Sequence, residues 1–358
     1  MKRTQAVMAD GRELFYFDRD ESQTRTAVDE RDLPDVASSI ERRLDISTGD
    51  WVAITAHRQS RTFKPSRASC PLCASAPGSP TEIPEPYDVV VFENRFPSFV
   101  EGAEAAETAP DGPYAVLPGN GRCEVVCFTD DHDTSFGELS PASARLVIDA
   151  WADRTADLSQ IETVEHVFPF ENRGEEIGVT LSHPHGQIYA YPFIPPRMAA
   201  HMRQAREHHH RTGRNLFADI LAGELADGRR IIATSECFTA FVPHAARWPV
   251  EVHLYPNRRV ADFTGLTDVE RDDLAVIYLD ILGRLDRMYD APLPYIAGWV
   301  QAPVRRDRDL GYLHLELVSI RRSADKLKYL AGSESAMGAF INDVAPEAAA
   351  ERLRELAT

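Results

Sequence analysis

The sequence of 358 residues predicts an α+β protein made of two duplicated halves. Short runs rich in Val, Phe and Ile alternate with a few long amphipathic segments, which is typical of mixed strands and helices. Segment 124–140 recurs in outline as 251–267, at an offset of 127 residues, and a long helical pattern follows each copy. SHPHGQIYA is matched by YLHLELVSI at an offset of 131, which sets His183 over His314. We therefore expect one half over residues 1–196 and the other over 197–358.

The first quarter of the chain predicts irregular structure with one clear hairpin. Residues 1–36 are polar and charged, so we expect a loose arm followed by a few short strands. Alternating apolar residues in 42–61 predict a β-hairpin that turns at Thr48-Gly49-Asp50. Pro, Ser and Gly in 74–88 and acidic residues in 101–112 predict two loops.

The remaining elements follow from hydrophobic periodicity. Residues 140–158 predict an amphipathic helix with Ser140 at its N-cap. In the second half, residues 197–226 and 268–289 predict helices, and 230–243 predicts extended structure. The predicted strands of the first half are 89–99, 123–132, 164–170 and 177–191.

The composition restricts the classes of function. The formal net charge is −17, and nucleic acids and anionic membranes both need a basic face, so we expect neither as a partner. The sequence lacks the run of about 18 apolar residues that a membrane span needs, and its N-terminus lacks the apolar core of a secretory signal. Five cysteines, an odd number in a long chain, indicate a reducing, cytoplasmic compartment.

Cys70 and Cys73 have the C-x2-C spacing by which two thiolates bind one zinc ion from a single turn. The Pro/Ser/Gly sequence after them predicts no helix, which disfavours a redox C-x-x-C motif. A closed tetrahedral site needs two more ligands, and His132 and His183 are the best candidates by position. Such an ion would be structural. The alternative is that two cysteines share a loop by chance.

His183, His185 and Gln187 follow one another at every second position in LSHPHGQIYAY. Residues with this spacing in a strand point to one face, so we expect the three side chains in a row. If His183 binds the metal, His185 is left as a nucleophile toward phosphorus, since a neutral imidazole keeps one lone pair when its other nitrogen donates a hydrogen bond. The alternative is that both histidines fill a polar strand face.

The glutamine indicates the reaction. Gln187 cannot protonate a poor leaving group as an acid would, so the leaving group must depart as an anion. A sugar phosphate, whose second pKa is about 6, can do this. Gly174 and Gly178 permit a loop whose N–H groups bind phosphate oxygens, and Asn172 adds a neutral donor. The residues therefore favour phosphoryl-group transfer between two phosphates over hydrolysis.

Together these motifs resemble the galactose-1-phosphate uridylyltransferases, the Leloir-pathway branch of the histidine-triad superfamily. The resemblance runs from about residue 43 to the C-terminus, and HPHGQ combined with C-x2-C and FENxG is its most specific part. It implies two histidine-triad-like halves, each an antiparallel sheet with packed helices, in a homodimer that shares its active sites. The motifs that carry it are AHRQSR (56–61), CPLC (70–73), VFENRFP (91–97), CFTDDH (127–132), FENRG (170–174), HPHGQ (183–187), ELADG (224–228) and RWPVE (247–251).

The resemblance implies ping-pong transfer of UMP from UDP-glucose to galactose 1-phosphate. By motif, His185 matches the nucleophile that becomes uridylylated, and Gln187 matches the residue that contacts the transferred phosphoryl group. It also implies one structural zinc ion, held by Cys70, Cys73, His132 and His183. The expected contacts to the nucleotide sugars and hexose 1-phosphates are Arg58, Arg61, Asn94, Arg95, Asn172, Gly178, Val179, Thr180, Gln187, Lys328, Tyr329, Ser333 and Glu334.

The chain departs from the family at three places. Arg95 stands where an acidic residue is common, and Thr180 stands where serine is common. The family's second metal site corresponds here to His201, Val300, His314 and Glu316. Valine cannot bind a metal, so the three remaining ligands would hold an ion weakly or form a metal-free cluster in which Glu316 accepts from both histidines; we expect the cluster. Because Glu316 occupies the position that matches the nucleophile, we expect no second nucleophile.

Two other functions remain open from the sequence. Nucleoside-polyphosphate phosphorylases and adenylyltransferases of the same superfamily also carry H-x-H-x-Q. A non-catalytic, zinc-containing sensor of nucleotide sugars would keep the same binding motifs. The HPHGQ core, the C-x2-C pair and the intact nucleophile favour uridylyl transfer over both.

Overall fold

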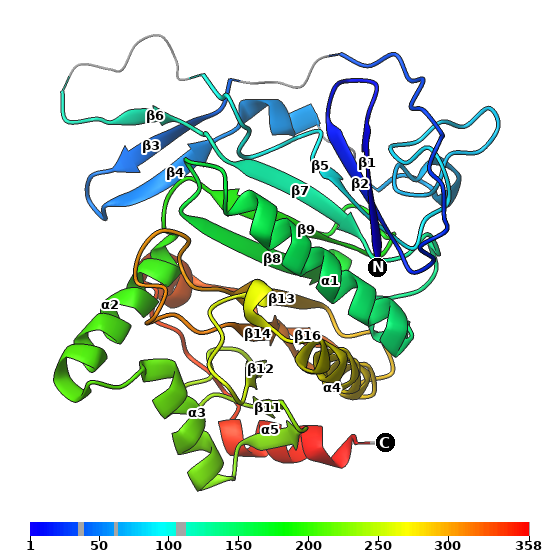
Figure 1. The fold of residues 1–358 in the computed structure, drawn as a ribbon. Helices are drawn as coiled ribbons and strands as arrows, with labels where there is room; N and C mark the ends of the chain where they lie inside the picture. The colour runs from blue at the N-terminus through cyan, green and yellow to red at the C-terminus, as the bar shows by residue number, and fades with distance from the viewer. Residues whose placement is uncertain (35–38, 61–63, 105–111, 358) are drawn as a thin grey trace.

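The computed structural model describes residues 1–34, 39–60, 64–104 and 112–357. One eleven-stranded sheet runs through both halves of the chain (Figure 1), and each strand pairs with its neighbours antiparallel. The predicted α+β class is confirmed. In spatial order the strands are β1 (Lys2–Val7), β2 (Glu13–Asp18), β5 (Val89–Glu93), β7 (Arg122–Cys127), β9 (His185–Tyr191), β8 (His166–Arg173), β13 (Tyr295–Val300), β14 (His314–Ser319), β12 (Val250–Pro256), β11 (Phe238–Phe241) and β10 (Ile231–Thr234).

The strand order is symmetrical about the pairing of β8 with β13. The series β5-β7-β9-β8 on one side is mirrored by β11-β12-β14-β13 on the other, in agreement with the repeat seen in the sequence. At the junction Phe170 pairs with Gly298, and a Cβ at Gly298 would lie 2.5 Å from the Phe168 ring. A side chain at position 298 would therefore displace the Phe168 ring from its place over the two central strands.

Two long helices cover one face of the sheet. These are α1 (Pro141–Leu158) and α4 (Asp268–Asp286), which lie in front of the strands in Figure 1 and pack against each other. Ser140 accepts a hydrogen bond from the Ser143 N–H, which confirms the predicted N-cap of α1. Between helices and sheet, Trp151 and Trp299 are almost fully buried with ring centroids 5.8 Å apart. Replacing such a buried tryptophan with alanine lowers the free energy of unfolding by about 3–5 kcal/mol.

The opposite face is covered differently in the two halves. Helices α2 (Pro196–Thr212) and α3 (Leu216–Asp227) pack on the second half through Met198, Met202 and Phe217. The irregular segment 64–88 covers the first half, with Leu72 and Tyr87 in its core. The largest cavity described below lies between this segment and the sheet. The smaller elements are β3 (Glu41–Asp45), β4 (Asp50–Ile54), β6 (Val116–Pro118), β15 (Arg321–Ser323), β16 (Lys326–Leu327) and α5 (Pro346–Glu355).

Several predicted elements need correction. The expected loose arm is wrong for residues 2–18, which form the edge strand β1 and its neighbour β2. The strand expected over 177–191 begins only at His185. The single helix expected over 197–226 is two helices, because Gly213 adopts a left-handed φ of 70° that ends α2. The hairpin turning at residues 48–50 is confirmed. Most of the predicted acidic loop falls on 105–111, outside the described residues.

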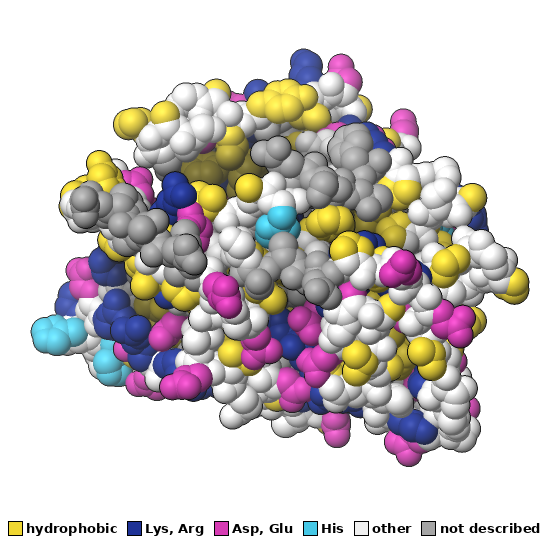
Figure 2. Space-filling model, turned by 90° about the horizontal axis from the view of Figure 1, so that it is seen from above, with side chains coloured by type: hydrophobic (Ala, Val, Ile, Leu, Met, Phe, Trp, Pro, Cys, Tyr) yellow, Lys and Arg dark blue, Asp and Glu magenta, His cyan; other side chains and the backbone are white. Residues whose placement is uncertain are grey.

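On the face seen in Figure 2, Lys and Arg side chains are interspersed with Asp and Glu. Among the described residues on that face, this mixture gives no continuous basic surface for a nucleic-acid backbone. Among the described residues, no helix is long and apolar enough to cross a membrane.

Candidate active site and metal centre

His185 and Gln187 lie on the same face of β9, and Gly186 and Ile188 point to the opposite, helix-covered face. The predicted row of three side chains is wrong for His183, because this residue precedes the strand and its side chain is buried away from the other two. Gly186 is required where it stands, since a Cβ there would lie 2.7 Å from the carbonyl oxygen of Phe170. The strand therefore presents one imidazole and one amide side by side.

The His185 ring is oriented by the residue that begins the motif. Its Nδ1 lies 2.7 Å from the backbone carbonyl oxygen of His183. A carbonyl oxygen can only accept, so Nδ1 carries the proton and Nε2 keeps its lone pair. Burial lowers the pKa of His185 below the usual value for an imidazole. The ring is therefore neutral at neutral pH and has one nucleophilic nitrogen.

Three cavities meet at His185, with volumes of about 470, 270 and 180 Å³. Residues from four distant parts of the sequence line them, which is the arrangement expected of a substrate site. The sequence-predicted contacts that line at least one of these cavities are Arg58, Asn94, Arg95, Asn172, Gly178, Val179, Thr180 and Gln187.

The amide of Gln187 is oriented by Asn94. Asn94 Nδ2 donates to Gln187 Oε1 at 3.4 Å, while Asn94 Oδ1 accepts from the Phe96 N–H at 2.8 Å. Because its oxygen is engaged, Gln187 directs its NH2 group elsewhere. A neutral donor is thus available beside the nucleophilic nitrogen of His185.

The glycine loop between β8 and β9 was predicted to offer its N–H groups to phosphate oxygens, but some of these groups are already engaged. Gly174 and Gly178 have φ values of 105° and 87°, which only glycine adopts without strain. However, the Gly178 N–H already donates to Glu175 O, and the Val179 N–H to Gly174 O. Thr180 lines all three cavities, and the described residues provide no hydrogen-bond partner for its N–H or hydroxyl. Thr180 therefore adds unengaged donors to the walls of all three cavities.

Arg58 brings a positive charge to the site. It lies in the short helix Ala56–Ser60, borders two of the three cavities, and donates to Ser98 Oγ and, at 3.2 Å, to the Tyr189 hydroxyl. The predicted contact Arg61 lies outside the described residues. The sequence analysis missed Tyr189, although it stands two residues after Gln187 and the strand period could have revealed it.

The four predicted metal ligands come together. The ligand atoms of Cys70, Cys73, His132 and His183 all lie within 4.8 Å of one another. Cys73 Sγ is 3.3 Å from His132 Nδ1 and 3.6 Å from His183 Nδ1. This is a compact set of two sulfurs and two imidazole nitrogens, as a structural zinc ion requires.

The surroundings of the four ligands also fit a cation. His183 Nε2 lies 2.9 Å from both the Thr129 carbonyl oxygen and the Tyr87 hydroxyl, so Nε2 carries the proton and Nδ1 is free to bind. Burial lowers the pKa of His183 to about 4, which keeps the ring neutral. Burial and the neighbouring Cys70 raise the pKa of Cys73 to about 11. A cation is therefore needed to make this sulfur a thiolate at neutral pH.

A second group of possible ligands lies on the same sheet face in the other half. His201, His314 and Glu316 have ligand atoms within 4.8 Å of one another. The expected hydrogen bonds are not formed, because Glu316 Oε1 is 3.6 Å from His314 Nε2 and 3.9 Å from His201 Nε2. Instead Arg197 donates to Glu316 Oε2 from Nε at 2.9 Å and Nη2 at 2.5 Å. Val300 is buried beside them and adds no ligand.

The predicted C-terminal contacts lie elsewhere. Lys328 Nζ pairs with Glu334 Oε1 at 3.0 Å, and Ser333 Oγ donates to the carbonyl oxygen of Ala339. The Tyr329 side chain is 74% exposed. None of Lys328, Tyr329, Ser333 and Glu334 lines the cavities that contain His185.

Comparison with known proteins agrees with this site. Residues 29–195 match the family described as galactose-1-phosphate uridyl transferase, N-terminal domain, and 201–358 match the corresponding C-terminal domain. The chain is 46% identical to the galactose-1-phosphate uridylyltransferase of Streptomyces lividans, over 100% of this chain and 98% of that one. It is 36% identical to that of Thermotoga maritima, over 88% and 98%. A solved uridylyltransferase structure superposes with a TM-score of 0.80 at 33% identity, over 88% and 98%.

Proposed function

The chain belongs to the galactose-1-phosphate uridylyltransferase family, and from this premise we propose how its residues carry out the reaction. The enzyme moves UMP from UDP-glucose to galactose 1-phosphate by a ping-pong mechanism through a uridylyl-histidine intermediate. One observation carries the residue assignment: the His185 ring borders three cavities and has its Nδ1 fixed by a carbonyl oxygen. Nε2 is then the only nitrogen that can attack.

In the first half-reaction, the lone pair on His185 Nε2 attacks the α-phosphorus of UDP-glucose. The N–P bond forms as the bond from this phosphorus to the bridging oxygen breaks, and glucose 1-phosphate leaves with the electron pair. No proton has to be supplied, because the leaving phosphate has a second pKa of about 6 and is stable as an anion. The Gln187 NH2 group donates to a non-bridging oxygen and stabilises the charge that develops there.

In the second half-reaction, a phosphate oxygen of galactose 1-phosphate attacks the same phosphorus. The P–N bond breaks, its electron pair returns to Nε2, and UDP-galactose is released with His185 neutral again. Arg58 and Thr180 border the cavities at the phosphorus and bind phosphate oxygens in both steps. Asn172 lines two of these cavities and is proposed to contact the substrates as well. Arg61 lies outside the described residues, and its contact stays an expectation from the sequence.

A zinc ion is the proposed occupant of the group formed by Cys70, Cys73, His132 and His183. Bound there, it supplies the charge that turns the two sulfurs into thiolates and leaves no open position for substrate. The role is structural: the ion fixes His183, whose carbonyl oxygen orients His185. For the group around Glu316 we propose a metal-free state, supported by the two hydrogen bonds from Arg197 and by the lack of a fourth ligand at Val300.

The active form is proposed to be a homodimer in which residues 328–341 reach the partner's site. The support is that this segment carries exposed apolar side chains, namely Tyr329, Leu330, Met337 and Ile341, and lies outside the cavities of its own chain. Replacing Tyr329 with Ala should then lower turnover without lowering the melting temperature. Mixing this variant with His185→Ala should restore part of the activity through dimers with one intact site. Val276→Ala, at an exposed apolar position on α4, is the control.

The proposed location is a reducing cytoplasm, which the five unpaired cysteines support.

We also propose a division of the chain near residue 196, supported by the symmetrical strand order and by family matches that end at 195 and resume at 201. The similarity to uridylyltransferases over the whole chain favours the assigned activity over the phosphorylase alternative.

The decisive experiment is incubation of the metal-replete enzyme with UDP-glucose alone, followed by mass spectrometry of its peptides. We expect one uridylyl group per chain, on His185, together with release of glucose 1-phosphate. His185→Ala should form no adduct and lose activity by at least about a thousandfold. His209→Ala, on the exposed side of α2, should behave as the unchanged protein. An adduct on another residue, or turnover by His185→Ala, would refute the assignment.

A further inference from the structure

The largest cavity at the nucleophile has an apolar floor that leads away from the phosphoryl site. Gln187 pairs with Val125 across β9 and β7, and Val125 pairs with Phe92 across β7 and β5. With strands about 4.8 Å apart, this floor extends roughly 10 Å from Gln187. Leu72 and Leu181 line the same cavity. An apolar slab of this kind suits the flat ring of a nucleotide base.

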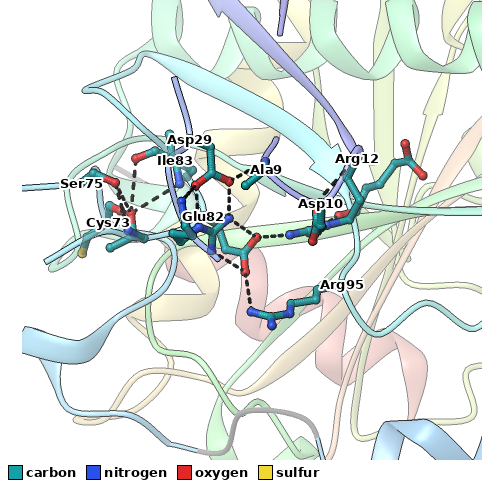
Figure 3. Close-up of polar contacts among 12 residues, drawn as sticks. Ala9, Asp10, Arg12, Asp29, Cys73, Ser75, Glu82, Ile83 and Arg95 are labelled. Atoms are coloured by element: carbon teal, nitrogen blue, oxygen red, sulfur yellow. Dashed lines mark hydrogen bonds and ion pairs between the residues drawn. The ribbon is translucent and has the colours of Figure 1, made fainter. Parts of the chain in front are cut away.

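A cluster of charged residues closes the cavity beyond the apolar floor. Glu82 lines the cavity and its Oε2 lies 2.6 Å from Arg12 Nη2 (Figure 3). Arg12 Nη1 in turn donates to the carbonyl oxygen of Glu93, at the end of β5. Because β5 is two strands away from β9, Glu82 stands at the end of the cavity remote from His185.

Glu82 is held firmly while a neighbouring arginine is not. Its Oε1 lies 3.1 Å from Arg31 Nη1, and Arg31 is itself tied to Asp29 at 2.7 Å. Arg95 Nη1 is 3.8 Å from the same oxygen, which is too long for a hydrogen bond (Figure 3). The Arg95 side chain is 31% exposed and lines the cavity, and the described residues provide it no other ion pair. A fixed acceptor and an adjustable donor thus lie side by side.

This inference rests on the proposed function, in which the transferred group is a nucleotide. Phosphate, ribose and base follow one another along a nucleotide, so a phosphorus at His185 sends the base toward Glu82. We propose that Glu82 and Arg95 recognise the edge of uracil and select it against cytosine. The Glu82 carboxylate accepts from the uracil N3–H, and the Arg95 guanidinium donates to the adjacent carbonyl oxygen.

Cytosine would present the opposite pattern to the same two side chains. Its N3 carries a lone pair that would face the carboxylate of Glu82, and its amino group would face the guanidinium of Arg95. Each contact would then be repulsive, and like-with-like contacts of this kind are one way in which a site rejects a close analogue. Nothing in this selection involves the bonds that form and break at phosphorus.

The test measures binding of UMP and CMP to the metal-replete, full-length enzyme by calorimetry, and adduct formation from UDP-glucose and CDP-glucose. The original enzyme should bind UMP at least about tenfold better than CMP. In Glu82→Gln the amide can face either base, so most of this preference should be lost. Arg95→Gln should reduce it by about tenfold. Asp88→Asn, whose carboxylate pairs with Arg19 outside the cavity, should leave the preference unchanged.

Equal binding of UMP and CMP by the original enzyme would overturn the inference. An unchanged preference for UMP over CMP in Arg95→Gln would also overturn the inference. If Glu82→Gln does not fold, the Arg95→Gln result is sufficient to test it. The inference and the proposed function fail separately. If the variants lose the preference for UMP but the original enzyme forms no covalent adduct, the proposed function is refuted and the role of Glu82 and Arg95 is supported. If the adduct forms and the variants keep the preference, only the role of Glu82 and Arg95 is refuted.

Discussion

The backbone carbonyl oxygen of His183 accepts a hydrogen bond from His185 Nδ1 at 2.7 Å, while the ring of His183 belongs to the candidate metal-binding group. One residue would therefore tie the position of a bound ion to the orientation of the proposed nucleophile. The His183 ring and its carbonyl oxygen belong to the same residue, and this oxygen holds His185 Nδ1, so a shift of His183 also moves the His185 ring. The proline between them limits the backbone freedom of this link.

Loss of the metal should consequently weaken positioning more than chemistry. In Cys73→Ser we expect lower metal content and a melting temperature lower by roughly 5 °C or more. The uridylyl adduct on His185 should still form, but more slowly. Cys237→Ser, at a half-buried cysteine outside the ligand group, is the matched control. Unchanged metal content and melting temperature in Cys73→Ser would show that these residues hold no ion.

Replacing Gln187 with Glu tests the neutral donor. The carboxylate would remove the N–H that stabilises the developing charge and would add a negative charge beside the phosphate. We expect the rate of adduct formation from UDP-glucose to fall about 10²- to 10³-fold, measured by rapid quench. Asn94→Ala frees the amide to rotate without removing it, and should cost less. A Glu variant with the original rate would remove Gln187 from the mechanism.

The pH dependence of the first half-reaction follows from the lowered pKa of His185. The neutral ring attacks and the protonated ring cannot, so a lowered pKa keeps the nucleophile active at lower pH. We expect kcat/KM for UDP-glucose to decline only below the ordinary imidazole value of about 6.5. Initial rates in constant-ionic-strength buffers measure this. An acid limb centred above that value contradicts the buried, neutral ring.

The free energy of unfolding should fall in acid because of His166, which lies outside both groups of possible metal ligands. His166 is buried with Nε2 donating to the Gln301 carbonyl oxygen, and burial lowers its pKa to about 4. The unfolded chain therefore takes up a proton near pH 6.5 that the folded chain takes up only near pH 4. Stability from this group is complete above pH 6.5 and is lost as pH falls to about 4, by about 3 kcal/mol. Urea unfolding of His166→Gln should show a weaker pH dependence; an identical one would contradict it.

Metal counting tests the second ligand group. We expect one tightly held ion per chain in the purified enzyme, measured by plasma mass spectrometry. Arg197→Gln removes the partner that neutralises Glu316, so this variant should bind an additional zinc ion when zinc is supplied. Arg203→Gln, at an exposed position on the same helix, should not. Two ions per chain in the original enzyme would show that His201, His314 and Glu316 already hold one.

Local patterns were sufficient to predict much of this protein. The ligands Cys70 and Cys73 are three residues apart, and His185 and Gln187 are two apart, so spacing alone sets their relative placement. The N-cap of α1 and the hairpin at 48–50 are likewise decided by neighbouring residues. The offset repeat in the sequence anticipated the symmetrical strand order.

Only the tertiary structure decided the contacts between distant segments. Arg12 meets Glu82 across 70 residues and Arg197 meets Glu316 across 119, and no pattern along the chain encodes either pair. His183 leaves the strand period because its ring is drawn into the group formed with Cys73 and His132. Such contacts depend on how whole strands and loops are placed against one another. Burial then makes them strong, since charged groups removed from water must find partners inside the protein.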